Sequence, residues 1–331
     1  MKARLSRYLD AVWYQGRPGL TWLRPLSWLT AKVAARRLRR FRVAAQRPPL
    51  PVLVVGNVTV GGTGKTPMVT ALCAEAAARQ LKVVIISRGY GAQPPAWPWI
   101  VTSEQDAAAC GDEPLMLAQL TGVPVIIDPQ RARALAAAQA LQPDLVISDD
   151  GLQHYALPRS AELVMLDGAR GLGNGRCLPC GPLREPATRL QQVDWIVSNG
   201  PLRQPLALPV QTLALEFSGF RHSSTGECLS PTEFAARHPR VHAVAGIGNP
   251  QRFFSQLRTL GLDVLEHPFA DHHQYRAEDL PREPALPCVV TEKDAVKLAA
   301  IAEVWVAPVI ARLPQGLAGI IIDTTLARAA G

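Results

Sequence analysis

The chain has 331 residues, 48% of them hydrophobic, which is enough for one large or two ordinary globular domains. Residues 1–47 hold twelve of the 35 lysines and arginines and one of the 27 acidic residues, so the formal net charge of +8 belongs to this arm. The remaining 23 basic and 26 acidic residues nearly balance, which excludes a basic nucleic-acid groove across the body of the protein, and we expect no nucleic-acid partner.

The N-terminal arm, residues 1–47, predicts a basic amphipathic helix. Apolar residues recur at helical spacing from Trp22 to Val33, and the basic segment AARRLRRFR follows them. Arg24 and Lys32 interrupt the apolar stretch, so it does not reach the length of a transmembrane helix. Tryptophan and leucine beside clustered arginines are typical of a helix that lies on a membrane surface; the alternative is an amphipathic helix packed on its own domain.

The stretch PVLVVGNVTVGGTGKTPMVTA (51–71) combines an apolar, β-branched strand, a glycine-rich turn and a helix with Pro67 in its first turn. The glycines allow backbone N–H groups to converge on one anion, and the helix N-terminus adds positive potential. In such a phosphate loop Lys65 reaches the outer phosphates of a nucleotide and the hydroxyl of Thr66 binds Mg²⁺. The loop departs from the usual pattern at Thr59, a position that is ordinarily glycine.

Strands and helices alternate from here to residue 150, which predicts a parallel sheet wrapped by right-handed crossovers. Ligands of such sheets bind outside the carboxyl ends of the strands. The predicted strand LKVVIISRGYG ends in three polar side chains of this kind, Ser87, Arg88 and Tyr90. In CGDEP (110–114), Asp112 and Glu113 are also explained as the acidic first turn of the next helix.

A second strong motif, PDLVISDDGLQH (143–154), is an apolar strand that ends in two aspartates. In phosphate-loop enzymes an acidic residue at the end of a neighbouring strand holds Mg²⁺, and Asp149 and Asp150 fit that position. Two adjacent carboxylates repel each other, so a nearby cation is a natural partner. A solvated turn is the alternative.

The second half of the chain predicts a separate, smaller domain. The proline-rich run QPLALP (204–209) indicates a linker, so we expect a P-loop domain over 48–203 and a smaller α/β domain over 204–331 that closes over the cleft. The run VHAVAGIGNPQRFF (241–254) lacks the third glycine of a dinucleotide motif, so a tight βα turn is expected there. Four arginines of the preceding glycine- and proline-rich loop are candidates for binding a phosphate: Arg170, Arg176, Arg184 and Arg189.

With these motifs in place, the chain resembles the tetraacyldisaccharide 4′-kinase family of lipid A biosynthesis. The stretches that carry the resemblance occur in the family's order and span most of the chain: GNVTVGGTGKTP (56–67), ISRGYG (86–91), GDEP (111–114), DDGLQH (149–154), LPCGPLREP (178–186), FADHH (269–273) and TEKDAVK (291–297). The resemblance implies a P-loop NTPase-like, mostly parallel sheet, with a smaller α/β domain and an N-terminal amphipathic helix that associates with the cytoplasmic face of the bacterial inner membrane.

The resemblance also implies a reaction: the γ-phosphate of ATP is transferred to the 4′-hydroxyl of a tetraacylated disaccharide 1-phosphate, giving the lipid IVA precursor. The implied catalytic residues are Asp112, His272 and Lys65, with the neighbouring His273 as an alternative to His272. The implied ATP-binding residues are Thr59, Val60, Gly61, Gly62, Thr63, Gly64, Lys65, Thr66, Gln153, Arg184 and Glu185. The implied Mg²⁺ ligands are Thr66, Asp149 and Asp150.

A membrane-attached NTPase switch that acts on a protein partner shares the phosphate loop, the aspartates and the basic arm. Guanine-specific proteins of that class often carry an N/T-K-x-D run, and TEKDA (291–295) is similar to it. The charged residues of this run either cap a helix or face the cleft between the domains.

Overall fold

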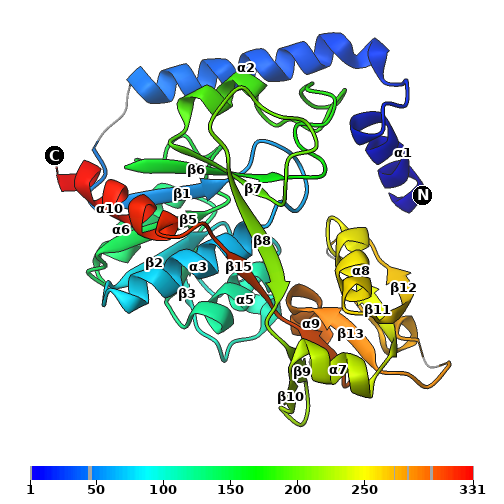
Figure 1. Cartoon of the computed structure of the whole chain (residues 1–331). Coiled ribbons are helices and arrows are strands. Elements are labelled where there is room, and N and C mark those ends of the chain that lie inside the picture. Colours follow the sequence, from blue (N-terminus) through cyan, green and yellow to red (C-terminus); the bar gives the residue numbers. More distant parts are fainter. Residues whose placement is uncertain (1, 44–46, 272, 282, 299–300, 331) are drawn as a thin grey trace.

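The computed structural model describes residues 2–43, 47–271, 273–281, 283–298 and 301–330. Two sheets of different size, each packed with helices, form the body of the molecule, and an N-terminal arm of two helices lies along one side of it (Figure 1). We call residues 48–217 with 309–330 the larger unit and residues 218–308 the smaller unit.

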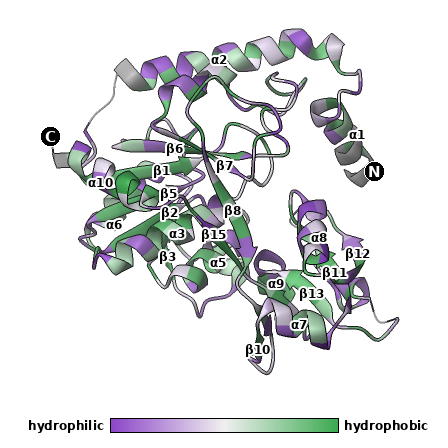
Figure 2. Cartoon of the chain, in the orientation of Figure 1, coloured by the Kyte–Doolittle hydropathy of each residue, from purple (hydrophilic) through white to green (hydrophobic). Residues whose placement is uncertain are grey.

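The larger sheet has nine strands in the order β15-β8-β7-β6-β1-β5-β2-β4-β3. The pairings from β8 to β4 are parallel, and β3 and β15 join the edges in antiparallel orientation. Its strands are β1 (Val52–Gly56), β2 (Val83–Ser87), β3 (Trp99–Val101), β4 (Val125–Ile127), β5 (Leu145–Asp149), β6 (Ala161–Asp167), β7 (Trp195–Asn199), β8 (Gln211–Phe217) and β15 (Val309–Arg312). Every residue of β1, β2, β5 and β6 is buried, as continuous apolar runs in a two-sided parallel sheet require (Figure 2).

Helices cover both faces of this sheet. Alternate residues of β1 point to opposite faces, so they belong to two separate cores. Leu53 and Val55 pack into the core with α3 (Lys65–Ala78), α5 (Asp112–Thr121) and α10 (Leu317–Ala330). Val52 and Val54 pack into the second core with α6 (Arg131–Gln139). The short α4 (Ala107–Cys110) precedes α5, and a 3₁₀ turn, η2 (Ala187–Gln192), lies on the α6 side. The predicted α/β architecture with a mostly parallel sheet is confirmed, and the strand before the phosphate loop, β1, lies at the centre of that sheet.

The smaller sheet has six strands in the order β10-β9-β14-β13-β11-β12. They are β9 (Phe220–His222), β10 (Cys228–Leu229), β11 (Arg240–Ala245), β12 (Asp263–Pro268), β13 (Cys288–Thr291) and β14 (Trp305–Ala307). Its helices are α7 (Pro231–Arg237), α8 (Pro250–Thr259), α9 (Glu292–Leu298) and the 3₁₀ turn η3 (Ala277–Asp279). The core is aromatic: Phe220 stacks on Phe234 at 3.9 Å between ring centroids, and Trp305 meets Phe234 edge-on at 5.1 Å.

The predicted boundary at residue 204 does not coincide with this topology. After the proline-rich run, the chain adds β8 to the larger sheet, parallel to β7, before it enters the smaller unit. It then returns through β15, which pairs antiparallel with β8, and α10 packs against α3 and β1. The proline-rich run therefore lies in a connection between two strands of the larger sheet. Two adjacent strands, β8 and β15, lead the chain into and out of the smaller unit (Figure 1).

The N-terminal arm comprises α1 (Lys2–Tyr14), η1 (Thr21–Leu23) and α2 (Arg24–Val43). One side of α2 packs on the protein: the hydroxyl of Ser27 donates to the carbonyl of Cys177 at 2.6 Å, and Leu38 is buried. Four large apolar side chains of α2 are roughly half or more exposed, Leu26, Trp28, Leu29 and Val33, and Trp22 of η1 is exposed as well. Among the described residues, no helix has both the length and the apolar character needed to cross a bilayer.

Candidate functional site

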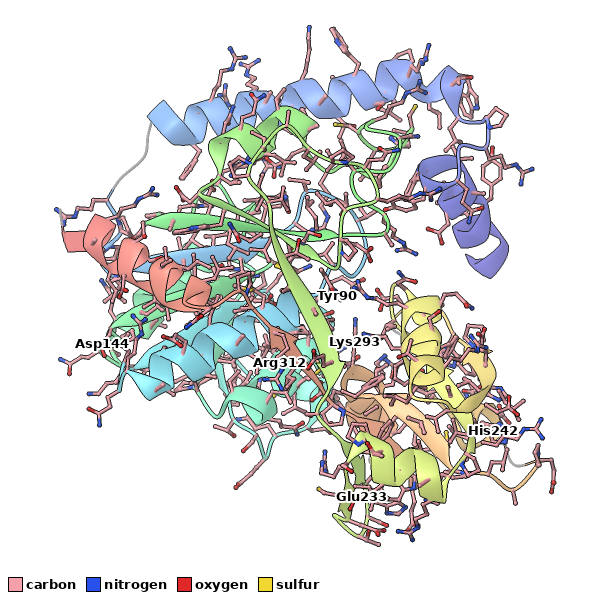
Figure 3. The ribbon with its side chains drawn as sticks, viewed as in Figure 1. Tyr90, Asp144, Glu233, His242, Lys293 and Arg312 are labelled. Atoms are coloured by element: carbon pink, nitrogen blue, oxygen red, sulfur yellow. The ribbon has the colours of Figure 1, made fainter. Side chains whose placement is uncertain are left out.

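A cavity of about 570 Å³ lies between the two units, at the carboxyl ends of the larger sheet's parallel strands. The last residues of four of these strands line it: Ser87, Asp149, Asp167 and Asn199. The smaller unit contributes the opposite wall. Tyr90, after β2, and Lys293, on α9, lie at the boundary between the units (Figure 3). This is where an open α/β sheet ordinarily binds its ligand.

The phosphate loop connects β1 to α3 and opens into this cavity. Gly61 and Gly64 adopt φ of 100° and 91°, which side-chain-bearing residues rarely do. Gly64 is the N-cap of α3 and provides no side-chain cap, so the first N–H groups of the helix remain available to an anion. The helix begins at Lys65, so Pro67 lies in its first turn, as predicted.

Six of the eight residues predicted in the phosphate loop, 61–66, line the cavity. The other two, Thr59 and Val60, face a neighbouring loop. Thr59 is buried and forms a β-bridge with Leu183, and the N–H of Val60 donates to the carbonyl of Pro182 at 2.9 Å. These two residues therefore fix the loop in place.

Two basic side chains converge on Asp150. Lys65 Nζ lies 3.4 Å from Asp150 Oδ1, and a guanidinium nitrogen of Arg184 lies 3.3 Å from Oδ2. Burial raises the pKa of Asp150, but Lys65 and Arg184 outweigh it and hold the pKa at about 2. Asp150 has φ of 46°, a left-handed conformation, immediately after β5 ends. Lys65, Asp150 and Arg184 therefore form one charged cluster at the phosphate loop.

Asp149 is different, because its carboxylate is 4% exposed and Oδ1 has no hydrogen-bond partner among the described residues. Burial, only partly offset by Lys65, raises the pKa of Asp149 to about 7. Thr63 Oγ1 is a second buried oxygen that lacks a partner in the described part of the chain. Buried, unpartnered oxygens beside a phosphate loop are a donor set that suits Mg²⁺, which prefers oxygen ligands and completes its octahedron with water and phosphate.

Gln153 and Glu185 lie beneath the phosphate loop and do not line the cavity. Gln153 Nε2 donates to the carbonyl of Asn57 at 3.0 Å and to Glu185 Oε1 at 2.7 Å. Glu185 is 1% exposed and also accepts from Tyr155 and Arg189. Arg189, predicted as a phosphate ligand, is buried in this ion-pair network. The direct nucleotide contact expected of Gln153 and Glu185 is therefore replaced by support of the loop from behind.

The acidic pair at the start of α5 divides between two positions. Glu113 lines the cavity and its carboxylate accepts from Lys293 Nζ at 2.8 Å, which links the two units. Asp112 is half-buried in the first turn of α5 and is not in the cavity wall. Lys293 also donates to Asp271 at 3.0 Å, so this residue of the TEKDAVK run faces the cleft.

The histidine loop is described except at His272, so the predicted role of His272 falls on a residue outside the described part of the chain. Its neighbour His273 is engaged within the smaller unit. Its Nε2 lies 3.1 Å from Asp279 Oδ2, and its ring packs on Phe269 at 4.6 Å. His273 does not line the cavity.

Arg131 is a cavity residue that sequence reasoning missed. It is 2% exposed, donates from Nη2 to the carbonyl of Asp149 at 2.7 Å, and leaves Nε and Nη1 without partners among the residues described. Burial, followed by the positive charges of Arg131 and Arg88, lowers the pKa of the nearby His154 to about 4. Arg131 lies three residues after the strand VPVIID (123–128), so the same strand-end rule that singled out Arg88 extends to it.

A turn of the smaller unit lies directly on the phosphate loop. A Cβ atom at Gly248 would stand 2.8 Å from the backbone nitrogen of Gly62. Arg170 donates to the carbonyl of Gly248 at 3.1 Å, and Arg252 donates to the carbonyl of Asn199 at 2.9 Å. The βα turn predicted from VHAVAGIGNPQRFF therefore covers the nucleotide site contributed by the larger unit.

Comparison with known proteins gives consistent matches. Residues 20–326 match the family model described as Tetraacyldisaccharide-1-P 4'-kinase. A relative from Alcanivorax borkumensis, named Tetraacyldisaccharide 4'-kinase, is 53% identical over 327 residues and covers 98% of this chain and 99% of its own. A relative of the same name from Pseudomonas aeruginosa is 54% identical over 304 residues, with 90% of each chain covered. A crystal structure of the "apo" form of LpxK from Aquifex aeolicus in complex with ATP matches with a TM-score of 0.75 and 29% identity, covering 92% of this chain and 99% of that one.

Proposed function

Because the chain belongs to the tetraacyldisaccharide-1-phosphate 4′-kinase family, we propose that the cavity between its two units is where ATP and the lipid acceptor react. The enzyme is an ATP-dependent kinase of lipid A biosynthesis, which transfers the γ-phosphate of ATP to the 4′-hydroxyl of a tetraacyldisaccharide 1-phosphate to form lipid IVA. The observation that carries the assignment of the site is that the phosphate loop opens beside Asp149 and Arg131 in one cavity, where Asp149 Oδ1 and Arg131 Nε and Nη1 have no partner among the described residues.

Phosphoryl transfer depends on positioning and on neutralising the charge that spreads over the transferred group. In our proposal the N–H groups at residues 61–66 hold the phosphates of ATP, and Lys65 moves from Asp150 to the outer phosphates when the nucleotide binds. Thr66, Asp149 and Asp150 are the proposed ligands of Mg²⁺, with Arg184 restraining Asp150. Held by these residues, Mg²⁺ would offset the negative charge of the phosphates.

The sugar hydroxyl is a weak nucleophile, so a base that accepts its proton raises the rate. We assign this role to His272, with Asp112 as the carboxylate that orients it. Two observations support the choice. His273 is already bonded to Asp279, and the GDEP turn places the start of α5 beside the cavity. The acceptor's headgroup is assigned to the side of the cavity that holds Arg88, Tyr90 and Arg131.

The direct test mixes purified protein, Mg²⁺, γ-labelled ATP and a tetraacylated disaccharide 1-phosphate in detergent micelles, and separates the lipids by chromatography. Label is expected in the lipid, and chelation of Mg²⁺ should abolish its appearance. Label released as free phosphate at the same rate with and without lipid would instead support a nucleotide-hydrolysing switch.

The geometry does not favour that switch as a guanine-specific protein. In the TEKD run the carboxylate of Asp294 is fully buried and accepts from the N–H of Gly246 at 3.0 Å, from Tyr275 at 3.0 Å and from Thr291 at 2.7 Å. An aspartate that reads guanine must present its oxygens to the base. These oxygens are used within the smaller unit.

We further propose that the exposed side of α2 holds the enzyme at the cytoplasmic face of the inner membrane as a peripheral protein. Trp22 and Trp28 are 77% and 60% exposed, and the second half of α2 is rich in arginine. Indole rings at the headgroup boundary, together with arginines on anionic lipids, are the usual chemistry of such a helix.

Replacing both tryptophans, Trp22→Ser with Trp28→Ser, should weaken binding to vesicles containing anionic phospholipid by roughly tenfold or more, because two large apolar side chains leave the bilayer. Vesicle flotation measures this. The matched control is Ile320→Ser, which removes a 57% exposed apolar side chain from α10. Equal flotation of the double variant and the control would contradict a membrane role for α2.

The turn over the phosphate loop gives another prediction. Gly248→Ala places a methyl group 2.8 Å from the Gly62 nitrogen, so the turn must move away from the loop. A displacement of about 1 Å at a reacting centre costs up to about 10²-fold in rate, and we expect kcat to fall by roughly tenfold or more. Steady-state kinetics measure the loss, and the melting temperature shows whether the fold is intact. Unchanged kcat would mean that the turn does not position the phosphates.

A further inference from the structure

The cavity has a second compartment on the side of the phosphate loop away from Asp149. Along the sheet, β5 and β2 lie on one side of β1, and β6, β7 and β8 lie on the other. Asp149, Arg88 and Arg131 belong to the first side. On the second side the cavity has an apolar lining of Leu215, Ile247, Phe253, Ala307 and Val309, beside the polar side chains of Asp167, Asn199 and Arg252.

Two further polar side chains, Glu292 and Gln256, lie beside the apolar residues of this compartment. Glu292, the first residue of α9, lines it and accepts a long hydrogen bond of 3.4 Å from the N–H of Val309. Burial raises the pKa of Glu292 to about 7, because few groups around it stabilise the charged form of the carboxylate. Gln256 also lines the compartment and is oriented by donating from Nε2 to the carbonyl of Leu215 at 3.0 Å.

The phosphate loop fixes the direction in which a nucleotide lies. Its phosphates lie against residues 61–66, and the outer phosphate must face the acceptor side, where the proposed metal ligands and Arg131 are. Arg131 Nε and Nη1 have no partner among the described residues. The nucleoside then extends to the opposite side. On that side, Leu215 and Phe253 offer apolar surface to the flat face of a base, and Glu292 lines the same part of the cavity.

We propose that this compartment binds the base of ATP and that Glu292 selects adenine by accepting a hydrogen bond from its 6-amino group. Guanine carries a carbonyl oxygen at the same position, so two acceptors would face each other. The proposal deepens the proposed function, because it rests on the use of ATP in this cavity. No comparison assigns a role to Glu292.

A site that hydrogen-bonds a substrate group rejects an analogue lacking that group, because its own polar atom is then left buried and unpaired. Purine riboside triphosphate lacks only the 6-amino group of ATP. The wild-type enzyme is expected to bind it about 10- to 100-fold more weakly than ATP, and GTP more weakly still. Glu292→Ala should bring the ratio between ATP and the analogue close to one. Glu292→Gln keeps an acceptor oxygen and should preserve a large part of the ratio.

The experiment measures the dissociation constants of ATP, GTP and purine riboside triphosphate by calorimetry for the wild type, both Glu292 variants and Glu216→Gln. Glu216 is a matched control, since it lies on β8 next to Leu215 but pairs with Arg312 at the surface. The control should behave as wild type. The proposal would be overturned if Glu292→Ala kept the wild-type ratio between the dissociation constants of the analogue and ATP. It would also be overturned if the wild type bound ATP and the analogue equally, a result that does not depend on the folding of any variant.

Nucleotide binding and phosphate transfer to lipid, measured separately, test the assignment of Glu292 and the proposed reaction site independently. Loss of the ratio in Glu292→Ala, with label still entering the lipid, supports both. If ATP binds with the expected preference but no label reaches the lipid, the assignment of the base stands and the proposed reaction site fails. If label reaches the lipid without any preference for the 6-amino group, the assignment of Glu292 fails alone.

Discussion

Lys65→Ala is expected to lower the kcat of lipid phosphorylation by about 10³-fold or more, the loss seen when a charged group that stabilises phosphoryl or oxyanion charge is removed. Lys65 begins α3 at the mouth of the phosphate loop, and its ammonium group is 3.4 Å from Asp150. The fold should survive the substitution, because Asp150 keeps its ion pair with Arg184 at 3.3 Å.

The matched control is Lys82→Ala, which removes an exposed lysine between α3 and β2. Its kcat should equal that of the wild type. Circular dichroism and the melting temperature of Lys65→Ala should stay near wild-type values. If Lys65→Ala turned over normally, the assignment of the phosphate loop would be wrong.

Asp149→Asn is expected to produce two opposite effects. Transfer to lipid should fall by about 10³-fold, because a proposed Mg²⁺ ligand loses its charge. The nucleotide-free protein should become more stable, because the substitution removes a carboxylate that is 4% exposed and whose Oδ1 has no partner among the described residues. For a protein of this size each kcal/mol gained raises the melting temperature by roughly 2–4 °C.

Differential scanning fluorimetry with and without Mg²⁺ and ATP distinguishes this result from ordinary stabilisation. The wild type should gain stability on adding both ligands, and the variant should gain much less, because it binds the metal more weakly. Asp323→Asn is the control, since Asp323 is an exposed aspartate paired with Arg79. A variant that melts below the wild type would show that the Asp149 carboxylate stabilises the fold, and its role would need to be reassigned.

Much of the larger unit follows from local pattern. The run VLVV, the glycine turn and the following helix are contiguous in sequence, so the strand, the loop and the helix N-terminus could be predicted together. The strand β5 and the two aspartates at its end are contiguous as well, and they could be predicted for the same reason. The family resemblance then added the direction of phosphate transfer and the identity of the acceptor, which no periodicity shows.

What escaped prediction depends on contacts between distant segments. Glu113 and Lys293 are 180 positions apart, and only the folded chain places them 2.8 Å from each other. Glu185 is an acidic residue in a functional motif, so it was expected to bind the nucleotide. In the structure its carboxylate accepts hydrogen bonds from Tyr155 and Arg189. The predicted domain boundary at residue 204 differs from the sheet topology, because prolines indicate the end of an element without indicating to which sheet the next strand belongs.

The return of the chain to the larger sheet has a consequence for how the protein is made. The smaller unit lies wholly between β8 and β15, so on a ribosome it is complete before β15 and α10 have been synthesised. Until then β8 lacks its β15 partner, and the apolar side of α3 that α10 covers remains open to solvent. Nascent chains with such surfaces are targets for chaperones and for aggregation. The kinase site, although its phosphate loop is encoded early in the chain, is therefore assembled late.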